Sequence, residues 1–182
     1  TQVSAGDLQA VHEKLVNYQL NHIFSTIPHF FDIVVCGNGG YPLDLNIYQA
    51  VKSMAIGEMG VKGGGTIISV NECSDGVGGG QDQFKKLLFS GFTPKDLYEQ
   101  ITSHQIVVPD QWEIQILARV MIRAEIYLIS GLKENEIGNI GLKYARTIES
   151  AIESALKKYG ENSSILILPH GPQILPIKRD KF

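Results

Sequence analysis

Three side chains with complementary chemistry lie close together in the chain: Tyr48, Gln49 and Lys52. Lys52 follows Tyr48 by four residues and Gln49 by three, so on a helix an ammonium, a phenol and an amide share one flank. Such a trio suits a small carboxylate that also carries a hydroxyl or keto oxygen. The alternative is an exposed lysine beside a half-buried tyrosine, and the spacing alone favours that alternative.

Trp112 is the only tryptophan, and it lies in the first turn of an expected helix after Pro109-Asp110-Gln111. A single tryptophan most often fills a core or an interface, but at a helix start beside a loop it can wall a pocket. The five histidines show no His-x-x-x-His pair and no companion cysteine at zinc spacing. We therefore assign no metal ligand within this chain.

A glycine-rich stretch, the glycine corner (36–44), joins an apolar run to the helix that carries Tyr48. In open α/β sheets ligands bind at the carboxyl ends of strands, which makes such a corner a candidate site. It is not a dinucleotide fingerprint, because Pro42 stands where the third glycine belongs. Tight-turn geometry is the simpler explanation of the glycines, and Asp44 is placed to cap the helix.

Apolar runs alternate with amphipathic segments along the chain. The expected strands are 30–35, 66–70, 125–129 and 164–168, with a short edge strand at 173–177. The helices expected between them are 45–59, 81–89, 94–104, 109–123 and 148–159. This alternation predicts right-handed crossovers and an α/β fold in three layers. The sheet is mainly parallel, with four to five strands and helices on both faces, in a Rossmann-like topology without the dinucleotide fingerprint.

The N-terminal segment 1–28 precedes the first expected strand. Apolar residues recur at spacings of three and four from Leu8 onward, which predicts an amphipathic helix that Pro28 ends. We expect this leading helix to pack on the domain. A chain of 182 residues fits one α/β domain (1–182), and its start at Thr1 suggests a piece of a longer protein.

The composition excludes some classes of binding partner and favours one cellular compartment. The formal net charge is −3 and no Lys/Arg cluster follows one element, so we expect no nucleic-acid partner. No stretch reaches the roughly 18 consecutive apolar residues that a membrane span needs, so we expect no membrane partner. Cys36 and Cys73 form no disulfide framework, which favours buried thiols in the reducing cytoplasm.

Several motifs occur in order through most of the chain. They are Asn38–Asp44, Asn46–Lys52, Gly64–Ile68, Cys73–Gly76, Pro109–Trp112, Gln115–Ala118 and Ile167–Pro169. Together these motifs resemble the C-terminal half of the nickel-dependent lactate racemase family. The block from Gly-Tyr-Pro-Leu-Asp to Lys52 is the most specific of them.

The resemblance implies a two-domain enzyme with its active site between the domains. In that family the cofactor is a nickel-pincer nucleotide, a modified nicotinic acid mononucleotide whose nickel takes a hydride from C2 of a 2-hydroxy acid. The metal ligand, the paired histidine bases and the lysine that holds the cofactor would belong to the N-terminal domain. The implied partners of this chain are therefore that domain and a small 2-hydroxy acid, and the chain alone would be inactive.

The same resemblance assigns roles to four residues. Tyr48 and Lys52 would be the catalytic residues that bind the substrate carboxylate or oxygen. Gln49 would line the same site toward both substrate and cofactor, and Trp112 would pack near the cofactor.

Two departures from the family pattern leave the choice of 2-hydroxy acid open. Leu45 stands where a polar residue is expected, and His170 stands where an acidic one is expected. A different class of function also remains open, namely an autonomous α/β module that holds a small anion or mononucleotide on the glycine corner without catalysis.

Overall fold

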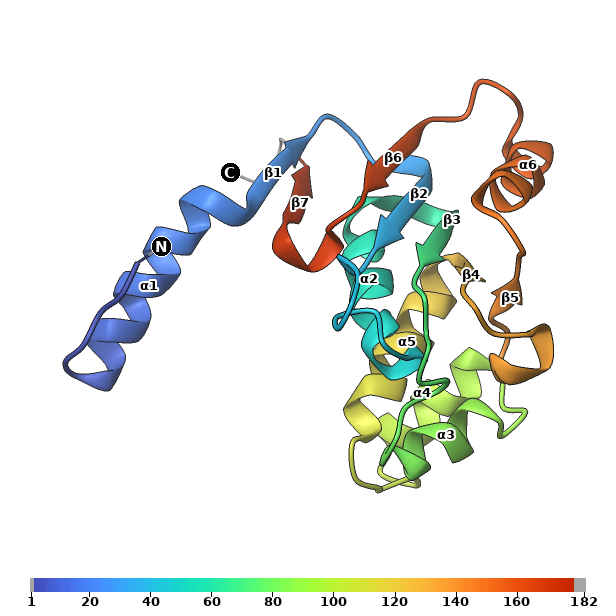
Figure 1. The fold of residues 1–182 in the computed structure, drawn as a ribbon, viewed down its shortest axis with the longest axis horizontal. Helices are drawn as coiled ribbons and strands as arrows, with labels where there is room; N and C mark the ends of the chain where they lie inside the picture. Colours follow the sequence, from blue (N-terminus) through green and yellow to red (C-terminus); the bar gives the residue numbers. More distant parts are fainter. Residues whose placement is uncertain (1, 179–182) are drawn as a thin grey trace.

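The computed structural model describes residues 2–178 and shows a parallel sheet enclosed by helices (Figure 1). In this part of the chain the main sheet has five strands in the order β5-β4-β3-β2-β6, all parallel. They are β2 (Phe31–Gly37), β3 (Val61–Val70), β4 (Glu125–Ile129), β5 (Lys143–Tyr144) and β6 (Ile165–Leu168). The predicted α/β class with a mainly parallel sheet is confirmed.

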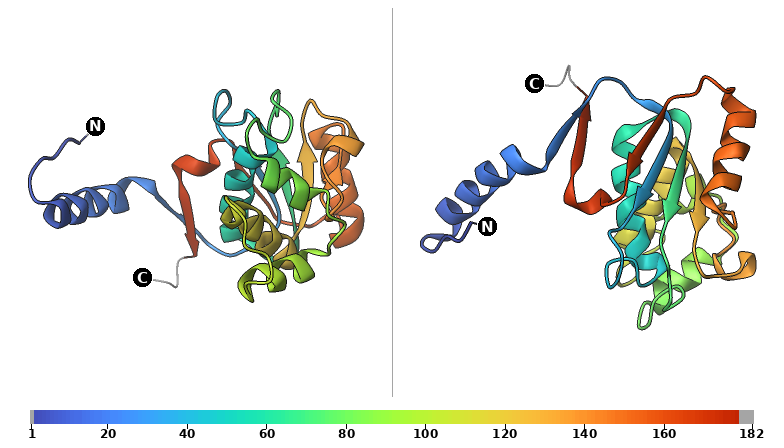
Figure 2. Two further views of the ribbon diagram at one scale, coloured as in Figure 1. Left: turned by 90° about the horizontal axis from the view of Figure 1, so that it is seen from below. Right: turned by 45° about the horizontal axis from the view of Figure 1, so that its top comes forward.

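Helices cover both faces of this sheet, so the sheet and its helices form three layers (Figure 2). On one face lie α2 (Ile47–Gly60) and α5 (Gln111–Arg123), with α3 (Asp82–Leu88) and α4 (Pro94–Thr102) packed on α5. On the other face lies α6 (Ile148–Tyr159), against β2 and β3. Short 3₁₀ turns, η1 (Glu134–Glu136) and η2 (Gly171–Gln173), lie in the connections.

Strand β2 lies inside the sheet and is buried on both faces. Val34 belongs to the core beneath α2 and α5, whereas Ile33 and Val35 belong to the core beneath α6. Because successive side chains of a strand point to opposite faces, a strand covered on both sides must be apolar throughout. The carboxyl end of β2 then delivers the chain into the glycine corner, beside the helix that carries Tyr48.

Two strand predictions need correction, and two strands were missed. β3 begins at Val61, five residues before the expected start at 66, so the glycines at 63–65 lie inside the strand. β5 was missed, because two residues carry no periodicity. The C-terminal strand β7 (Leu175–Lys178) does not extend the main sheet; it pairs in parallel with β1 (Phe24–Ile27), which was also missed, in a separate two-stranded sheet. The η2 turn separates β7 from β6 and redirects the chain.

The leading helix α1 (Leu8–Ile23) forms as predicted, and the Asp7 side chain caps it by accepting from Ala10 N–H at 3.1 Å. It does not pack on the domain as expected. Figures 1 and 2 show α1 standing away from the sheet, joined to it through β1. Several apolar side chains of α1 are exposed, and Leu8 is 86% exposed. None of the described helices is both long and apolar enough to span a bilayer.

Candidate functional site

The helix that carries Tyr48 begins at Ile47 and is fixed by polar contacts at its start. The Asn46 side chain caps it by accepting from Gln49 N–H at 3.0 Å. The N–H groups of Ile47 and Tyr48 donate to carbonyls of the 71–80 loop at 3.0 and 3.1 Å. These three leading N–H groups already have acceptors, so the start of α2 does not offer them to a phosphate or a carboxylate.

Asp44 does not cap the helix as predicted. Its carboxylate accepts from Glu72 N–H at 3.2 Å, and so it ties the glycine corner to the loop after β3. The cap lies two residues later, at Asn46, whose extended backbone directly precedes the first turn. A cavity of about 310 Å³ borders the corner, lined by Asn38, glycines 37, 39 and 40, and mostly apolar side chains. These observations weaken the case for an anion held on the corner itself.

Two members of the predicted trio, Gln49 and Lys52, contact each other on α2, whereas Tyr48 of the same helix packs into the core. Lys52 Nζ donates to Gln49 Oε1 at 2.5 Å, which holds the ammonium over the preceding turn. Lys52 is exposed, Gln49 is half-buried and Tyr48 is 9% exposed. The lysine head is therefore available to an anion, while the tyrosine is held firmly by its surroundings.

Trp112 joins this flank from a different helix. Its ring lies 6.0 Å from the Tyr48 ring, centroid to centroid, in an edge-on arrangement, and Phe84 of α3 contacts Tyr48 edge-on at 5.3 Å. Trp112 is 49% exposed, so half of its indole is open to a ligand or to another domain. The prediction of a pocket wall at a helix start therefore has a geometric basis, which we name the Tyr48 site (Tyr48, Gln49, Lys52 and Trp112).

Burial, aided by two nearby carboxylates, keeps the Tyr48 phenol protonated. Burial raises the pKa of Tyr48, and the carboxylates of Asp110 and Glu113 raise it further. A protonated phenol beside an ammonium presents two kinds of donor, which suits an oxyanion with a neighbouring hydroxyl or keto oxygen.

Glu113 is the residue of this site that the sequence interpretation missed. It is 1% exposed, and neither of its carboxylate oxygens has a hydrogen-bond partner among the described residues. Burial raises its pKa to about 7, the positive charge of Lys52 lowers it, and Asp110 raises it. The signal was present, because Glu113 lies four residues before the core residue Leu117, where an apolar side chain is expected.

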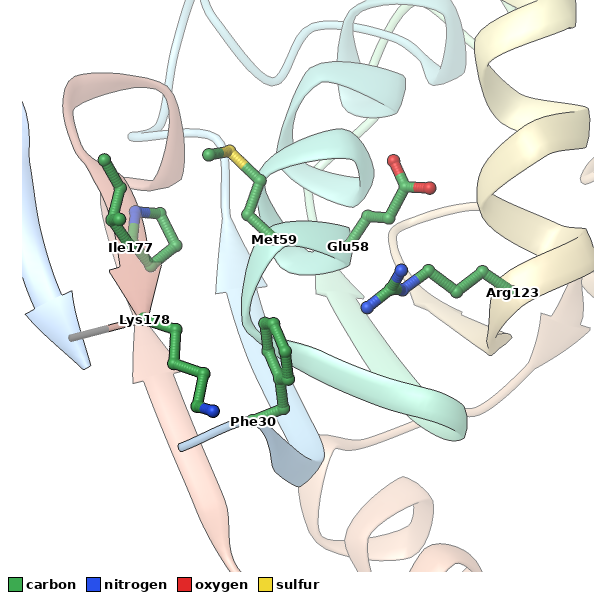
Figure 3. A pocket seen from close by; sticks show the side chains of 7 residues that line it. Phe30, Glu58, Met59, Arg123, Ile177 and Lys178 are labelled. Carbon is green, nitrogen blue, oxygen red and sulfur yellow. The ribbon is translucent and has the colours of Figure 1, made fainter. Parts of the chain in front are cut away.

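A larger cavity, of about 620 Å³, lies at the far end of α2 and is separate from the Tyr48 site. Figure 3 shows side chains around it, which come from α2, α5, β7 and the residue before β2: Glu58, Met59, Arg123, Ile177, Lys178 and Phe30. The Arg123 guanidinium lies 5.7 Å from the Phe30 ring centroid and donates to the Val61 carbonyl at 3.2 Å. None of the predicted site residues lines this cavity.

Within residues 2–178 no group of three or more His, Cys, Asp and Glu side chains is placed to hold a metal ion. Cys36 and Cys73 are free and fully buried, as predicted, and burial raises the pKa of each thiol to about 12. The Tyr48 site therefore fits the organic part of an implied cofactor and an anionic substrate, through an open indole and an ammonium. The metal ligands of such a cofactor would have to come from elsewhere.

The fold and the site together define a three-layer α/β domain that presents an exposed lysine on one helix and a half-exposed tryptophan on another. Comparison with known proteins gives the family: residues 28–175 match the model of the lactate racemase C-terminal domain, and the chain belongs to that family. Lactate racemase from Lactiplantibacillus plantarum is 37% identical over 171 residues, and that from Thermoanaerobacterium thermosaccharolyticum is 37% identical over 147 residues. The apoprotein structure of the latter organism's lactate racemase superposes with a TM-score of 0.83 at 32% identity.

The coverage of these matches is unequal. They include 92% and 79% of this chain for the two sequences and 91% for the structure. On the other side, the chain spans only 39%, 34% and 40% of the respective relatives. The family and the fold are thereby shown, whereas the activity of a whole enzyme is a matter for proposal.

Proposed function

We propose that this chain is the C-terminal domain of a racemase or epimerase that inverts C2 of a lactate-like 2-hydroxy acid. The observation that supports the proposal is the edge-on contact of Tyr48 on α2 with the half-exposed Trp112 on α5, on the helix where Gln49 orients the exposed Lys52. The domain supplies substrate-binding groups and, within the described residues, no metal-ligand cluster. A complete reaction then needs a second domain, and the site lies between the two.

Lys52 is the group that binds the substrate anion. Its ammonium is exposed and oriented by Gln49, so a carboxylate can replace or share that hydrogen bond without a large movement of the side chain. A charge-assisted hydrogen bond of this kind is roughly twice as strong as a neutral one. When C2 becomes planar, the same charge stabilises the electron density that builds up on the keto oxygen.

Tyr48 orients the substrate through its hydroxyl. Because its ring is fixed between Trp112 and Phe84, the hydroxyl has little freedom to follow the substrate. The raised pKa keeps its proton in place, so Tyr48 donates a hydrogen bond and does not act as a base. Proton removal from the substrate hydroxyl is left to groups outside this chain.

The cofactor that we propose is the nickel-pincer nucleotide of the family, held mainly by the N-terminal domain. When bound, this cofactor would supply the hydride chemistry: an acceptor for the hydride of C2, and its return to either face of the substrate carbon. Trp112 and Gln49 are the residues of this chain that would contact it, since one presents an open indole and the other an amide on the same flank. Together they exclude water from the side of the substrate that faces this domain.

The surface that would meet the N-terminal domain includes α1. This helix stands apart from the sheet and exposes apolar side chains: Leu8, Val16 and Leu20. Exposed apolar side chains on a helix that stands apart from its own domain suit an interface with another domain. The free, buried cysteines further support a cytoplasmic location for the whole protein.

The test is racemisation of D- and L-lactate and related 2-hydroxy acids by the full-length, cofactor-loaded protein. We expect activity with at least one of them, and Lys52→Ala should lower kcat/KM about 10²–10³-fold, as for loss of one donor to a developing oxyanion. Lys157→Ala, an exposed lysine of α6, is the matched control and should leave activity unchanged. Full activity in Lys52→Ala would show that the assigned role is wrong.

A further inference from the structure

Glu113 occupies a position that folding alone does not explain. It lies in the first turn of α5, on the side that packs against α2, and it is 1% exposed. Both of its carboxylate oxygens lack a hydrogen-bond partner among residues 2–178. An ionised carboxylate in that state is strongly unfavourable, so the group must be neutral or be compensated by a nearby positive charge.

The charged groups that act on Glu113 come from two directions. Lys52, on the facing helix α2, attracts its negative charge, and Asp110, in the turn before α5, repels it. The Tyr48 phenol also interacts with Glu113, because the negative charge of Glu113 raises the pKa of Tyr48. The helices α3 and α4, which also pack on α5, face the core with apolar side chains: Phe84, Leu88, Leu97 and Ile101.

We propose that Glu113 is a positioning residue that couples anion binding at Lys52 to the uptake of one proton from solvent. In the free site, the Glu113 carboxylate and the Lys52 ammonium attract each other. When an anion binds, its charge compensates Lys52, the Glu113 carboxylate loses that stabilisation, and it takes a proton from water to become a neutral acid. This inference rests on the proposed role of Lys52.

The coupling has a defined sign. Burial places the pKa of Glu113 at about 7, so at pH 7 about half of the molecules carry the carboxylate and can take up a proton when the anion binds. Between pH 7 and the higher pKa of Glu113 in the anion-bound protein, the uptake rises toward one proton, and anion affinity falls by up to about tenfold per pH unit. Below pH 6 Glu113 is already neutral, and the affinity no longer depends on it.

The first experiment measures the proton directly. L-lactate is titrated calorimetrically into the cofactor-free, full-length protein at pH 7.5, in two buffers of different ionisation enthalpy, which gives the protons taken up per anion bound. We expect proton uptake in the wild type and in the control Glu153→Gln, an exposed glutamate of α6. In Glu113→Gln the uptake should be lost while lactate still binds. Equal uptake in Glu113→Gln and the wild type would overturn the proposal.

A second experiment does not need an anion at all. In protein labelled with ¹³C at glutamate side-chain carboxyls, the resonance that Glu113→Gln removes should titrate near neutral pH. In Lys52→Ala it should titrate at higher pH, because the attracting charge is gone. An identical titration in both proteins would refute the Glu113–Lys52 coupling. If the coupling is present but lactate does not bind, the proposed substrate is wrong and the coupling stands.

Discussion

Replacing Tyr48 by phenylalanine separates the chemistry of this residue from its packing. The change removes one hydroxyl and keeps the ring between Trp112 and Phe84, at 6.0 and 5.3 Å. A hydrogen bond from this hydroxyl to a charged substrate oxygen contributes about 1.5–3 kcal/mol. Since each 1.36 kcal/mol corresponds to a factor of ten, kcat/KM should fall by roughly 10- to 150-fold. The free energy of unfolding should change by no more than about 0.5 kcal/mol.

The assay is racemisation of a 2-hydroxy acid by the full-length protein, with thermal unfolding of the same samples. Tyr48→Ala is the informative contrast: it also opens a cavity beside Phe84 and should cost about 3–5 kcal/mol of stability, as for other buried aromatic residues. Loss of activity in Tyr48→Phe without loss of stability supports a direct role for the hydroxyl. An active Tyr48→Phe enzyme would refute the reasoning, and Tyr48 would then be a packing residue only.

Three further predictions concern stability. The pKa of Asp32 is lowered to about 2, and its hydrogen bond from Lys62 at 2.7 Å is the largest cause. The stability that this ionised carboxylate adds should be complete above about pH 4 and be lost as pH falls toward 2. Acid unfolding of Asp32→Asn should lack this pH-dependent loss. Gly57→Ala should destabilise by about 1–3 kcal/mol in denaturant unfolding despite its better helix propensity, because its Cβ would lie 2.9 Å from Ile67 Cγ2. Glu113 has a raised pKa of about 7, so wild-type stability should decline as pH rises from about 4.5 to 7, and pH-dependent melting of Glu113→Gln should lack that decline.

The parts of the fold that depend on residues close together in the chain could be predicted from the sequence. The run Ile33-Val34-Val35 is apolar because both faces of β2 are covered, and three consecutive residues suffice to show it. The flank of Tyr48 and Lys52 followed from helical periodicity, because α2 is a regular helix through that region. The local sequence pattern was sufficient where one helix or strand alone determines which way its side chains point.

The features that were missed depend on contacts distant in the sequence. β1 and β7 pair across about 150 residues, and nothing within either four-residue segment specifies the partner. The apolar stripe of α1 predicts burial, but the pattern does not identify the surface that would cover it. In this structure α1 stands away from the sheet, and Leu8 is 86% exposed. The cap of α2 moved from Asp44 to Asn46 because the loop after β3 binds Asp44. In each case tertiary structure overrides a correct local signal.

Two residues next to each other break the ordinary rules of burial in opposite directions. Trp112, the largest apolar side chain, is 49% exposed, and Glu113, an acid, is 1% exposed. Local rules are most often broken at functional sites, where the fold holds side chains against their preference. Both exceptions lie on the first turn of α5, and they face Tyr48 and Lys52 across the contact with α2. The open indole of Trp112 and the buried carboxyl group of Glu113 beside Lys52 are the two features that the proposed anion site uses.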